Sequence, residues 1–316
     1  MIKYFVKKDQ KLREIDTPEL DCWINITPPF SQEELEEVAL LLEIPLDFLT
    51  DSLDIDERAR YDRDDGVRHI IINTPVHNES VSDSNAYYVT VPIGIILTTN
   101  HTITISAFEN TILESFLKNK IKNFDPKDEK LFVLQLFEQN IYAYLNALKK
   151  LNLQRNIIEK ELLISTENRH LIELLRIEKS LVYFVNALSA AELLNMKMKR
   201  SDFLQINGDE EKNELFEDII IDSSQALQMA NIYANIQGST METYGSIINN
   251  NVNAVMQRLT LVTIIIAVPT LVASIFGMNI HFYGLEENKN ALVYILIGSF
   301  IFALLLSWFF RRKRLL

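Results

Sequence analysis

The sequence predicts an α+β domain, a β-sheet surrounded by helices, from which a long helical stalk continues into a hairpin of two transmembrane helices. Three observations support this fold class. Residues 259–280 and 291–310 contain no charged side chain, and each run is long enough to cross about 30 Å of hydrocarbon as a helix. Residues 1–125 contain short segments rich in β-branched and aromatic residues, a composition typical of strands. From residue 126 onward the pattern becomes helical.

Residues 1–125 are expected to form a mixed domain with helices around a sheet. Turn-forming residues bound five strand-like segments, which are residues 1–6, 22–26, 67–73, 86–97 and 102–106. Ser31 and Glu34 have the spacing of a capping box, which predicts the start of a helix. That helix is expected to run to about Leu42, and Pro45 is expected to begin a second, short helix.

Residues 126–208 are expected to form a helical region. Residues 128–165 contain no glycine or proline and carry apolar residues at helical spacing, and a similar pattern covers about residues 169–198. Asn207-Gly208-Asp209 interrupts this pattern.

The next stretch is predicted to be one unusually long helix. From residue 210 to Phe276 the chain contains a single proline, Pro269, and a continuous helix of this length would span about 100 Å. A small globular domain cannot bury such a helix. Residues 209–258 are therefore expected to form a stalk that runs into a first membrane helix, residues 259–279.

The distribution of charge predicts how the membrane hairpin is oriented. The basic tail, residues 311–316, follows the second membrane helix, residues 291–310, whereas the intervening loop, residues 280–290, holds Glu286, Glu287 and one lysine. The positive-inside rule then places the tail in the cytoplasm and the loop outside. Because the N-terminus lacks a signal peptide, we expect a two-span protein of the cell membrane with both termini in the cytoplasm.

Composition excludes several functional classes. A net charge of -12 argues against nucleic acid, which binds basic surfaces, and suits divalent cations better. Cys22 is the only cysteine, so no internal disulfide or thiol cluster can form, and a buried free thiol is expected. The glycines form no phosphate-binding motif, and the histidines show no metal-ligand spacing; His69 and His101, in strand-like segments, are expected to be packed or surface residues. We therefore expect no enzyme.

Polar side chains share one face of the predicted first membrane helix. Its hydrogen-bonding side chains are the hydroxyls of Thr260, Thr263, Thr270 and Ser274, and Ala267 lies in the same arc. Continuing the spacing of three or four residues toward the N-terminus adds Met256 and Asn253. The four hydroxyl residues lie within roughly 80° at about 100° per residue. Two interpretations remain open: a contact between helices, which small hydroxyl residues favour, or the wall of a water-filled pore. One chain with two membrane helices cannot enclose a pore, so conduction would require an oligomer.

Gly277-Met278-Asn279 stands at the outer end of this polar face. Mg²⁺ loses its water reluctantly, and a ring of neutral amide and carbonyl oxygens can accept hydrogen bonds from the hydrated ion. Asn279 supplies such an oxygen, and Gly277 would let the backbone bend as the helix ends. This tripeptide, at the turn of a C-terminal membrane hairpin, resembles the CorA family of divalent-cation channels.

The resemblance implies a funnel-shaped homo-oligomer in the lipid bilayer, with five subunits, that passes Mg²⁺ down its electrochemical gradient. It places the outer selectivity ring at Asn279. It also implies pore positions, which are Thr270, Leu259, Met256 and Asn253, the last three at a cytoplasmic constriction. Regulatory Mg²⁺ that closes the channel would bind between subunits at carboxylates, for which the candidates are Asp218 and Asp222 with Glu79 or Asp83 as partners.

The sequence departs from the family pattern in three places. Phe276 stands where the family commonly has tyrosine, the acidic Met-Pro-Glu loop is missing, and Pro269 comes one residue late. These departures put ion capture by the loop in doubt. Two alternatives stay open: transport of zinc, cobalt or nickel within the same family, and a membrane-anchored scaffold or sensor.

Overall fold

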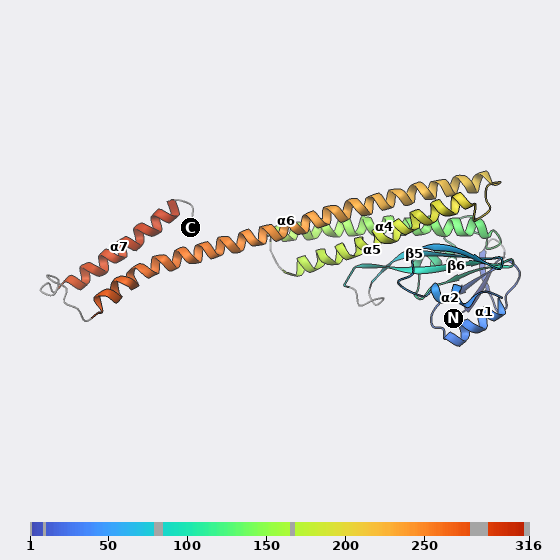
Figure 1. Cartoon of the computed structure of the whole chain (residues 1–316), viewed down its shortest axis with the longest axis horizontal. Coiled ribbons are helices and arrows are strands. Elements are labelled where there is room, and N and C mark those ends of the chain that lie inside the picture. Colours follow the sequence, from blue (N-terminus) through green and yellow to red (C-terminus); the bar gives the residue numbers. More distant parts are fainter. Residues whose placement is uncertain (1, 9–10, 79–84, 165–167, 279–289, 313–316) are drawn as a thin grey trace. The chain divides into compact units, whose positions relative to one another are not determined.

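The structure is a computed structural model that describes residues 2–8, 11–78, 85–164, 168–278 and 290–312 (Figure 1). The chain divides into two compact units, Met1–Ser239 and Thr240–Leu316. The first unit holds a sheet and its covering helices, and the second holds a helical hairpin.

In the described residues of the first unit, seven strands form one sheet in the order β2-β1-β3-β7-β6-β5-β4. The strands are β1 (Ile2–Lys8), β2 (Lys11–Ile15), β3 (Cys22–Ile26), β4 (Arg60–Asp64), β5 (Val67–His77), β6 (Tyr88–Leu97) and β7 (His101–Ile105). Neighbouring strands are antiparallel except β3 and β7, which run parallel. The predicted sheet domain is therefore confirmed.

The two strands that the sequence did not predict are the two edges of the sheet. β2 and β4 read KLREI and RYDRD, and all of their side chains are exposed or half-buried. Charged residues are depleted from central strands but are common on edge strands, where they discourage pairing with other chains. A prediction based on β-branched and aromatic content therefore misses both.

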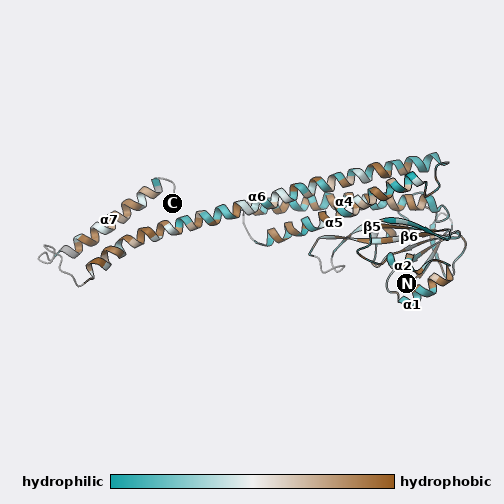
Figure 2. Ribbon diagram, viewed as in Figure 1, coloured by the Kyte–Doolittle hydropathy of each residue, from teal (hydrophilic) through white to brown (hydrophobic). Residues whose placement is uncertain are grey.

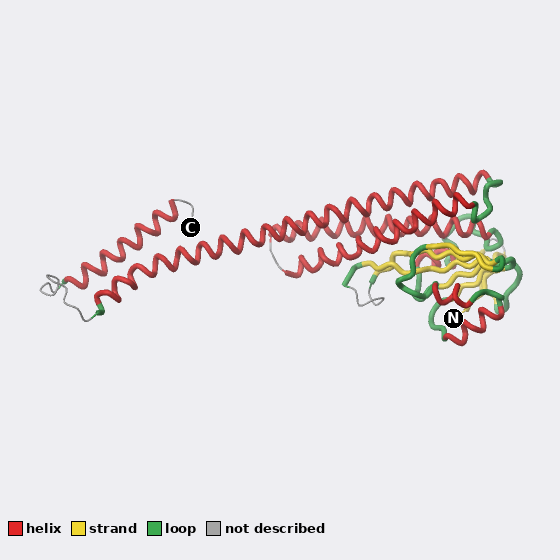
Figure 3. Tube along the Cα trace, viewed as in Figure 1, coloured by secondary structure: helices red, strands yellow, loops and turns green. Residues whose placement is uncertain are grey.

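Helices cover both faces of the sheet, as Figures 1 and 3 show. On one face, α1 (Gln32–Leu41) and α2 (Leu46–Asp51) pack on the aliphatic side chains of β3 and β7. Ser31 caps α1 and Glu34 completes the capping box, as predicted. α2 follows Pro45, also as predicted.

The opposite face carries α3 (Thr111–Leu117), α4 (Glu129–Ile164) and α5 (Asn168–Ser201). α3 was not predicted; the Asn110 side chain caps it. An aromatic cluster fills this side of the core around Trp23, whose ring centroid lies 5.2 Å from that of Phe132 on α4. Trp23 is fully buried and its indole nitrogen donates a 2.7 Å hydrogen bond to Thr104 on the neighbouring strand.

α6 (Glu210–Phe276) is the long helix that the sequence predicts. At its start, Lys212 Nζ lies 2.9 Å from carboxylate oxygens of both Asp128 and Asp209, which ties it to the beginning of α4. Further along, the buried Gln237 side chain donates a 3.0 Å hydrogen bond to the Leu174 carbonyl oxygen on α5. In the first unit α6 therefore packs along α4 and α5 (Figure 1).

The second unit contains the last part of α6 and α7 (Ala291–Arg312). α6 and residues Val293–Phe310 of α7 are each long and apolar enough to cross a membrane. Figure 2 shows the change along α6, from mixed colours in its first part to mainly hydrophobic residues near its end. The second membrane helix was expected at residues 291–310, and α7 begins at the same residue and ends two residues later.

Candidate functional site

The polar face of α6 is intact in the structure. The seven residues predicted to share it, Asn253, Met256, Thr260, Thr263, Ala267, Thr270 and Ser274, all lie on α6 and are exposed in the single chain. The apolar Leu259, which the resemblance adds, is also exposed and sits at the edge of this face, at about 100° per residue. We refer to these eight residues as the polar stripe.

Three hydroxyl groups of the stripe make the same local hydrogen bond. Thr260, Thr263 and Thr270 each donate to the carbonyl oxygen four residues earlier, at 2.8–2.9 Å. This is a common arrangement for threonine inside an apolar helix. Because each hydroxyl hydrogen is used in this way, the oxygen presents only its lone pairs to whatever faces the stripe.

The covered face of α6 lies opposite the stripe. From residue 259 to 276, the buried or half-buried side chains are Leu261, Ile265, Val268, Pro269, Val272 and Phe276. At ~100° per residue their mean direction is about 170° from that of the stripe. The side of α6 opposite the stripe is therefore its less exposed side, with Leu261 buried and the other five side chains half-buried.

α7 has a matching covered face. Its buried or half-buried side chains, among those described, are Ile295, Ser299, Ala303, Leu306, Ser307 and Phe310. Ser299 and Ala303 are the most buried of these, and small residues allow membrane helices to approach closely. α7 therefore also has a less exposed face, which is rich in small residues.

The outer end of α6 is described as far as Met278. The Gly277 amide donates a 2.9 Å hydrogen bond to the Ala273 carbonyl oxygen, so Gly277 still continues the helical hydrogen-bond pattern. α6 ends at Phe276, directly before Gly277, and the Met278 amide already bonds to Ile275, three residues back. The helix thus ends where the sequence suggested, and Gly277 takes part in this ending without a positive φ. Asn279, Glu286 and Glu287 lie outside the described residues.

The regulatory candidates on α6 lie beside α4. Asp218 is exposed and Asp222 half-buried, and both face Tyr142 of α4 closely enough to affect its ionisation. The negative charge of Glu138, followed by burial and by the charges of Asp222 and Asp218, raises the pKa of Tyr142. Glu138 thus belongs to the same acidic surface, and sequence reasoning missed it because its position along α4 gives no signal of what α6 places next to it.

The other two regulatory candidates, Glu79 and Asp83, lie outside the described residues. Among the described residues, no group of three His, Cys, Asp or Glu side chains is arranged to hold a metal ion. A cation on the acidic surface would therefore need further ligands, which a second copy of the chain could supply.

A serine–histidine pair is present but closed to solvent. Ser52 Oγ donates 2.7 Å to the Phe48 carbonyl oxygen and lies 2.9 Å from His69 Nε2. Both residues are buried, and burial, reinforced by the charge of Arg60, lowers the pKa of His69 to about 4. The neutral imidazole therefore donates through Nε2 to Ser52, and the pair holds α2 on the sheet; His69 is packed, as expected.

Cys22 and His101, which were also expected in strands, are neighbours across the β3–β7 pair. Cys22 is a buried free thiol, as predicted. His101 is half-buried, with Nδ1 3.5 Å from Cys22 Sγ.

These features together define a class: a protein with a large α+β domain, two helices long and apolar enough to cross a membrane, and an exposed polar face on the first of them. The model of the family described as CorA-like Mg2+ transporter protein matches residues 21–312. The chain belongs to this family.

A relative and a solved structure of the same family each match this chain over most of its length. It is 26% identical over 295 residues to the cobalt/magnesium transport protein CorA of Methanocaldococcus jannaschii, covering 92% of this chain and 90% of that one. The complete structure of the CorA magnesium transporter from the same organism matches with a TM-score of 0.80, 24% identity and coverage of 99% and 98%.

Two more distant structures share the fold. The full-length CmaX protein matches with a TM-score of 0.68, 15% identity and coverage of 99% of this chain and 97% of that one. The cytoplasmic domain of ZntB from Vibrio parahaemolyticus matches with a TM-score of 0.59, 10% identity and coverage of 79% and 97%.

Proposed function

We propose that this chain forms a magnesium channel of the cell membrane, which passes hydrated Mg²⁺ down its electrochemical gradient. The observation that carries the proposal is the opposition of the two faces of α6. The side opposite the stripe is buried or half-buried, whereas every residue of the polar stripe is exposed. In a bilayer, exposed polar residues generally face a water-filled cavity or another protein surface.

The chemistry of the stripe suits a hydrated cation. The waters bound directly to Mg²⁺ point their hydrogens outward, so the wall of a pore must accept hydrogen bonds. Thr260, Thr263 and Thr270 have given their own hydrogens to the backbone and can act only as acceptors toward the pore. Because Mg²⁺ keeps its water readily, neutral acceptors can guide it without trapping it.

Conduction requires several copies of the chain. Two membrane helices cannot enclose a pore, so we assign a homo-oligomer, with five subunits on the basis of family resemblance. In this assembly the stripes surround the axis, Gly277, Met278 and Asn279 form the outer ring, and Asn253, Met256 and Leu259 form the cytoplasmic constriction. Both termini are cytoplasmic in this proposal, which the basic residue cluster after α7 supports.

Closure by cytoplasmic Mg²⁺ is assigned to the acidic surface of α6. Asp218, Asp222 and Glu138 all lie close enough to Tyr142 to raise its pKa. A divalent ion held between this surface and a neighbouring subunit would be attracted by all three negative charges. Glu79 or Asp83 would supply the neighbour's ligands.

Cobalt is a second candidate ion, because the relative at 26% identity is named for both cobalt and magnesium. Neutral oxygen acceptors that contact only the hydration shell discriminate weakly between hydrated divalent ions of similar size, which also leaves nickel and zinc as candidate ions. A membrane-anchored scaffold is the alternative of a different class, and it gives the polar stripe no role.

The proposal is tested by Mg²⁺ flux into proteoliposomes that contain the full-length protein, followed with an internal Mg²⁺ indicator. We expect flux that follows an imposed membrane potential and falls strongly with Asn279→Ala. Co²⁺, Ni²⁺ and Zn²⁺ tested in the same vesicles give the ion preference. If correctly inserted oligomers transport no divalent ion, the channel proposal fails and the scaffold interpretation is favoured. If cross-linking of the detergent-solubilised protein gives only a monomer, the channel proposal also fails.

A further inference from the structure

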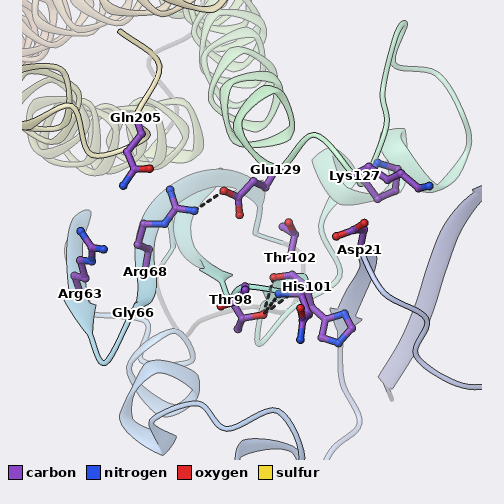
Figure 4. A pocket seen from close by; sticks show the side chains of 13 residues that line it. Asp21, Arg63, Gly66, Arg68, Thr98, His101, Thr102, Lys127, Glu129 and Gln205 are labelled. Atoms are coloured by element: carbon purple, nitrogen blue, oxygen red, sulfur yellow. Dashed lines mark hydrogen bonds and ion pairs between the residues drawn. The ribbon is translucent and has the colours of Figure 1, made fainter. Parts of the chain in front are cut away.

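A polar cavity of about 350 Å³ lies in the first unit, and none of its lining residues belongs to the acidic surface (Figure 4). Separate parts of the chain converge on it: the β4–β5 turn, the β6–β7 turn, the segment that leads into α4, and the loop between α5 and α6. The side chains used below are those of Arg63, Arg68, Lys127, Glu129, His101 and Gln205.

Two arginines face each other across the β4–β5 hairpin. Arg63 and Arg68 are direct partners in the antiparallel register, so their side chains leave the same face of the sheet with Cβ atoms about 5 Å apart. Like charges in this position repel and destabilise the pair. Both side chains line the cavity, and Figure 4 shows them on the same side of it.

The positive charge of this arginine pair is only partly compensated. Arg68 is held by an ion pair from Nη2 to Glu129 at the start of α4, but its Nη1 is a buried donor without a hydrogen-bond partner among the described residues. Across the described ranges of the chain, no ion pair involves Arg63. Glu129 therefore pairs with Arg68 but not with Arg63.

The rest of the lining favours an oxyanion over other ligands. An apolar ligand would desolvate threonine, asparagine and charged side chains. A metal ion would find only Asp21 and Glu129 as carboxylates, and Glu129 is already paired with Arg68. Burial lowers the pKa of His101, so the imidazole is neutral near pH 7 and the positive charge comes from Arg63, Arg68 and Lys127.

We propose that Arg63 and Arg68, together with the Gln205 amide, form a binding site for the phosphate group of a small anion. A guanidinium group binds phosphate through two parallel hydrogen bonds. The guanidinium groups of Arg63 and Arg68 lie on the same side of the cavity (Figure 4), so both can bind one phosphate group. The phosphate removes the repulsion across the hairpin and offers acceptors to the unused donors. Lys127 adds a third cation on the rim.

The ligand would also connect the sheet to the beginning of α6. Gln205 belongs to the loop between α5 and α6. Its backbone carbonyl oxygen accepts a 2.7 Å hydrogen bond from Lys130 Nζ. Figure 4 shows its side chain directed toward Arg68. An anion held by both arginines and Gln205 would therefore restrain the segment just ahead of α6.

The site is tested by isothermal titration of the full-length protein in detergent, in buffer free of divalent ions. Inorganic phosphate, glucose 6-phosphate and citrate serve as probes. We expect phosphate binding that Arg63→Gln weakens about tenfold, as for a lost charge-assisted bond, and that Arg63→Lys weakens less. Arg200→Gln, which removes an exposed arginine outside the cavity, is the matched control and should leave the affinity unchanged.

The probes distinguish the sources of the phosphate group. Tighter binding of glucose 6-phosphate assigns the site to a phosphate ester, and equal binding assigns it to inorganic phosphate. Equal phosphate affinity of wild type and Arg63→Gln, preference for citrate, or no binding at about ten millimolar phosphate would each overturn the proposal. Hydrogen exchange should slow in residues 202–209 when phosphate is added, and unchanged exchange there would overturn the role of Gln205.

Discussion

Thr263 donates its hydroxyl hydrogen to the carbonyl oxygen of Leu259 at 2.8 Å while its side chain remains exposed on the polar stripe. The threonine therefore satisfies its own donor inside the helix and offers only an acceptor outward. In the proposed channel this acceptor contacts the water shell of the ion. Removing the acceptor should therefore affect the passage of the ion more than the stability of the helix.

Replacing Thr263 by valine should slow Mg²⁺ flux while leaving the oligomer intact, because valine keeps the shape and removes the acceptor. The loss of one hydrogen bond of about 1 kcal/mol predicts roughly a fivefold decrease. Flux per reconstituted oligomer is the measurement. Thr263→Ser keeps the hydroxyl and should stay near wild type, and full flux in the valine variant would remove the stripe from the pore wall.

Asn253 and Asn251 provide a matched pair on α6. They are the same residue type, both exposed, and about 160° apart around the helix, so that only Asn253 lies on the stripe. Asn253→Ala should change flux or the relative permeation of Mg²⁺ and Co²⁺, whereas Asn251→Ala should not. If both variants behave alike, the cytoplasmic end of the stripe does not face the ion.

Neutralising the acidic surface should weaken closure by cytoplasmic Mg²⁺. In the double variant Asp218→Asn/Asp222→Asn, the Mg²⁺ concentration needed for half-maximal closure should rise several-fold, because the surface loses two of its negative charges. Glu217→Gln is the control, since Glu217 neighbours Asp218 but is paired with Lys199 at 2.6 Å. An unchanged closing concentration in the double variant would place the regulatory ion elsewhere.

His69 should make the first unit less stable in mild acid. The folded pKa is lowered to about 4 from 6.5, so above pH 6.5 the histidine is neutral in both states and contributes no pH dependence. As the pH falls from 6.5 toward 4, the unfolded chain gains a proton that the folded chain does not. The free energy of unfolding should therefore drop by about 3 kcal/mol over this window and then level off.

Unfolding of the full chain in detergent, followed by the fluorescence of the buried Trp23, measures this dependence. The variant His69→Gln retains a hydrogen-bonding side chain but cannot titrate, so its stability should change less between pH 6.5 and 4. Parallel curves for the two proteins would show that other groups cause the acid sensitivity.

Much of the fold was predictable because its signals are local. The capping box of Ser31 and Glu34 appears in the structure as predicted, and the uncharged segments became the last part of α6 and α7. The edge strands β2 and β4 were missed because their pairing, not their composition, makes them strands. α3 was missed because it is only one or two turns long and its stability comes from packing Phe116 into the aromatic cluster.

The residues of the candidate sites also fall into those that the sequence predicts and those that it does not. The polar stripe follows from helical periodicity alone, so the sequence was sufficient to find it. Glu138 beside Asp218, and Arg68 opposite Arg63, could not be found in this way. They depend on which helix packs on which and on the register of two strands, and each pair is set by contacts that sequence spacing does not encode.

The sequence by itself determined two apolar segments long enough to cross a membrane, a long helix leading into the first, and a polar face along that helix. These properties depend on residue order and on the constant geometry of the α-helix. Only the tertiary structure decided that the polar face is exposed and that the opposite side is the less exposed one, because exposure depends on the neighbours that each side chain meets. The burial of a side chain depends on tertiary contacts, which residue order alone does not specify.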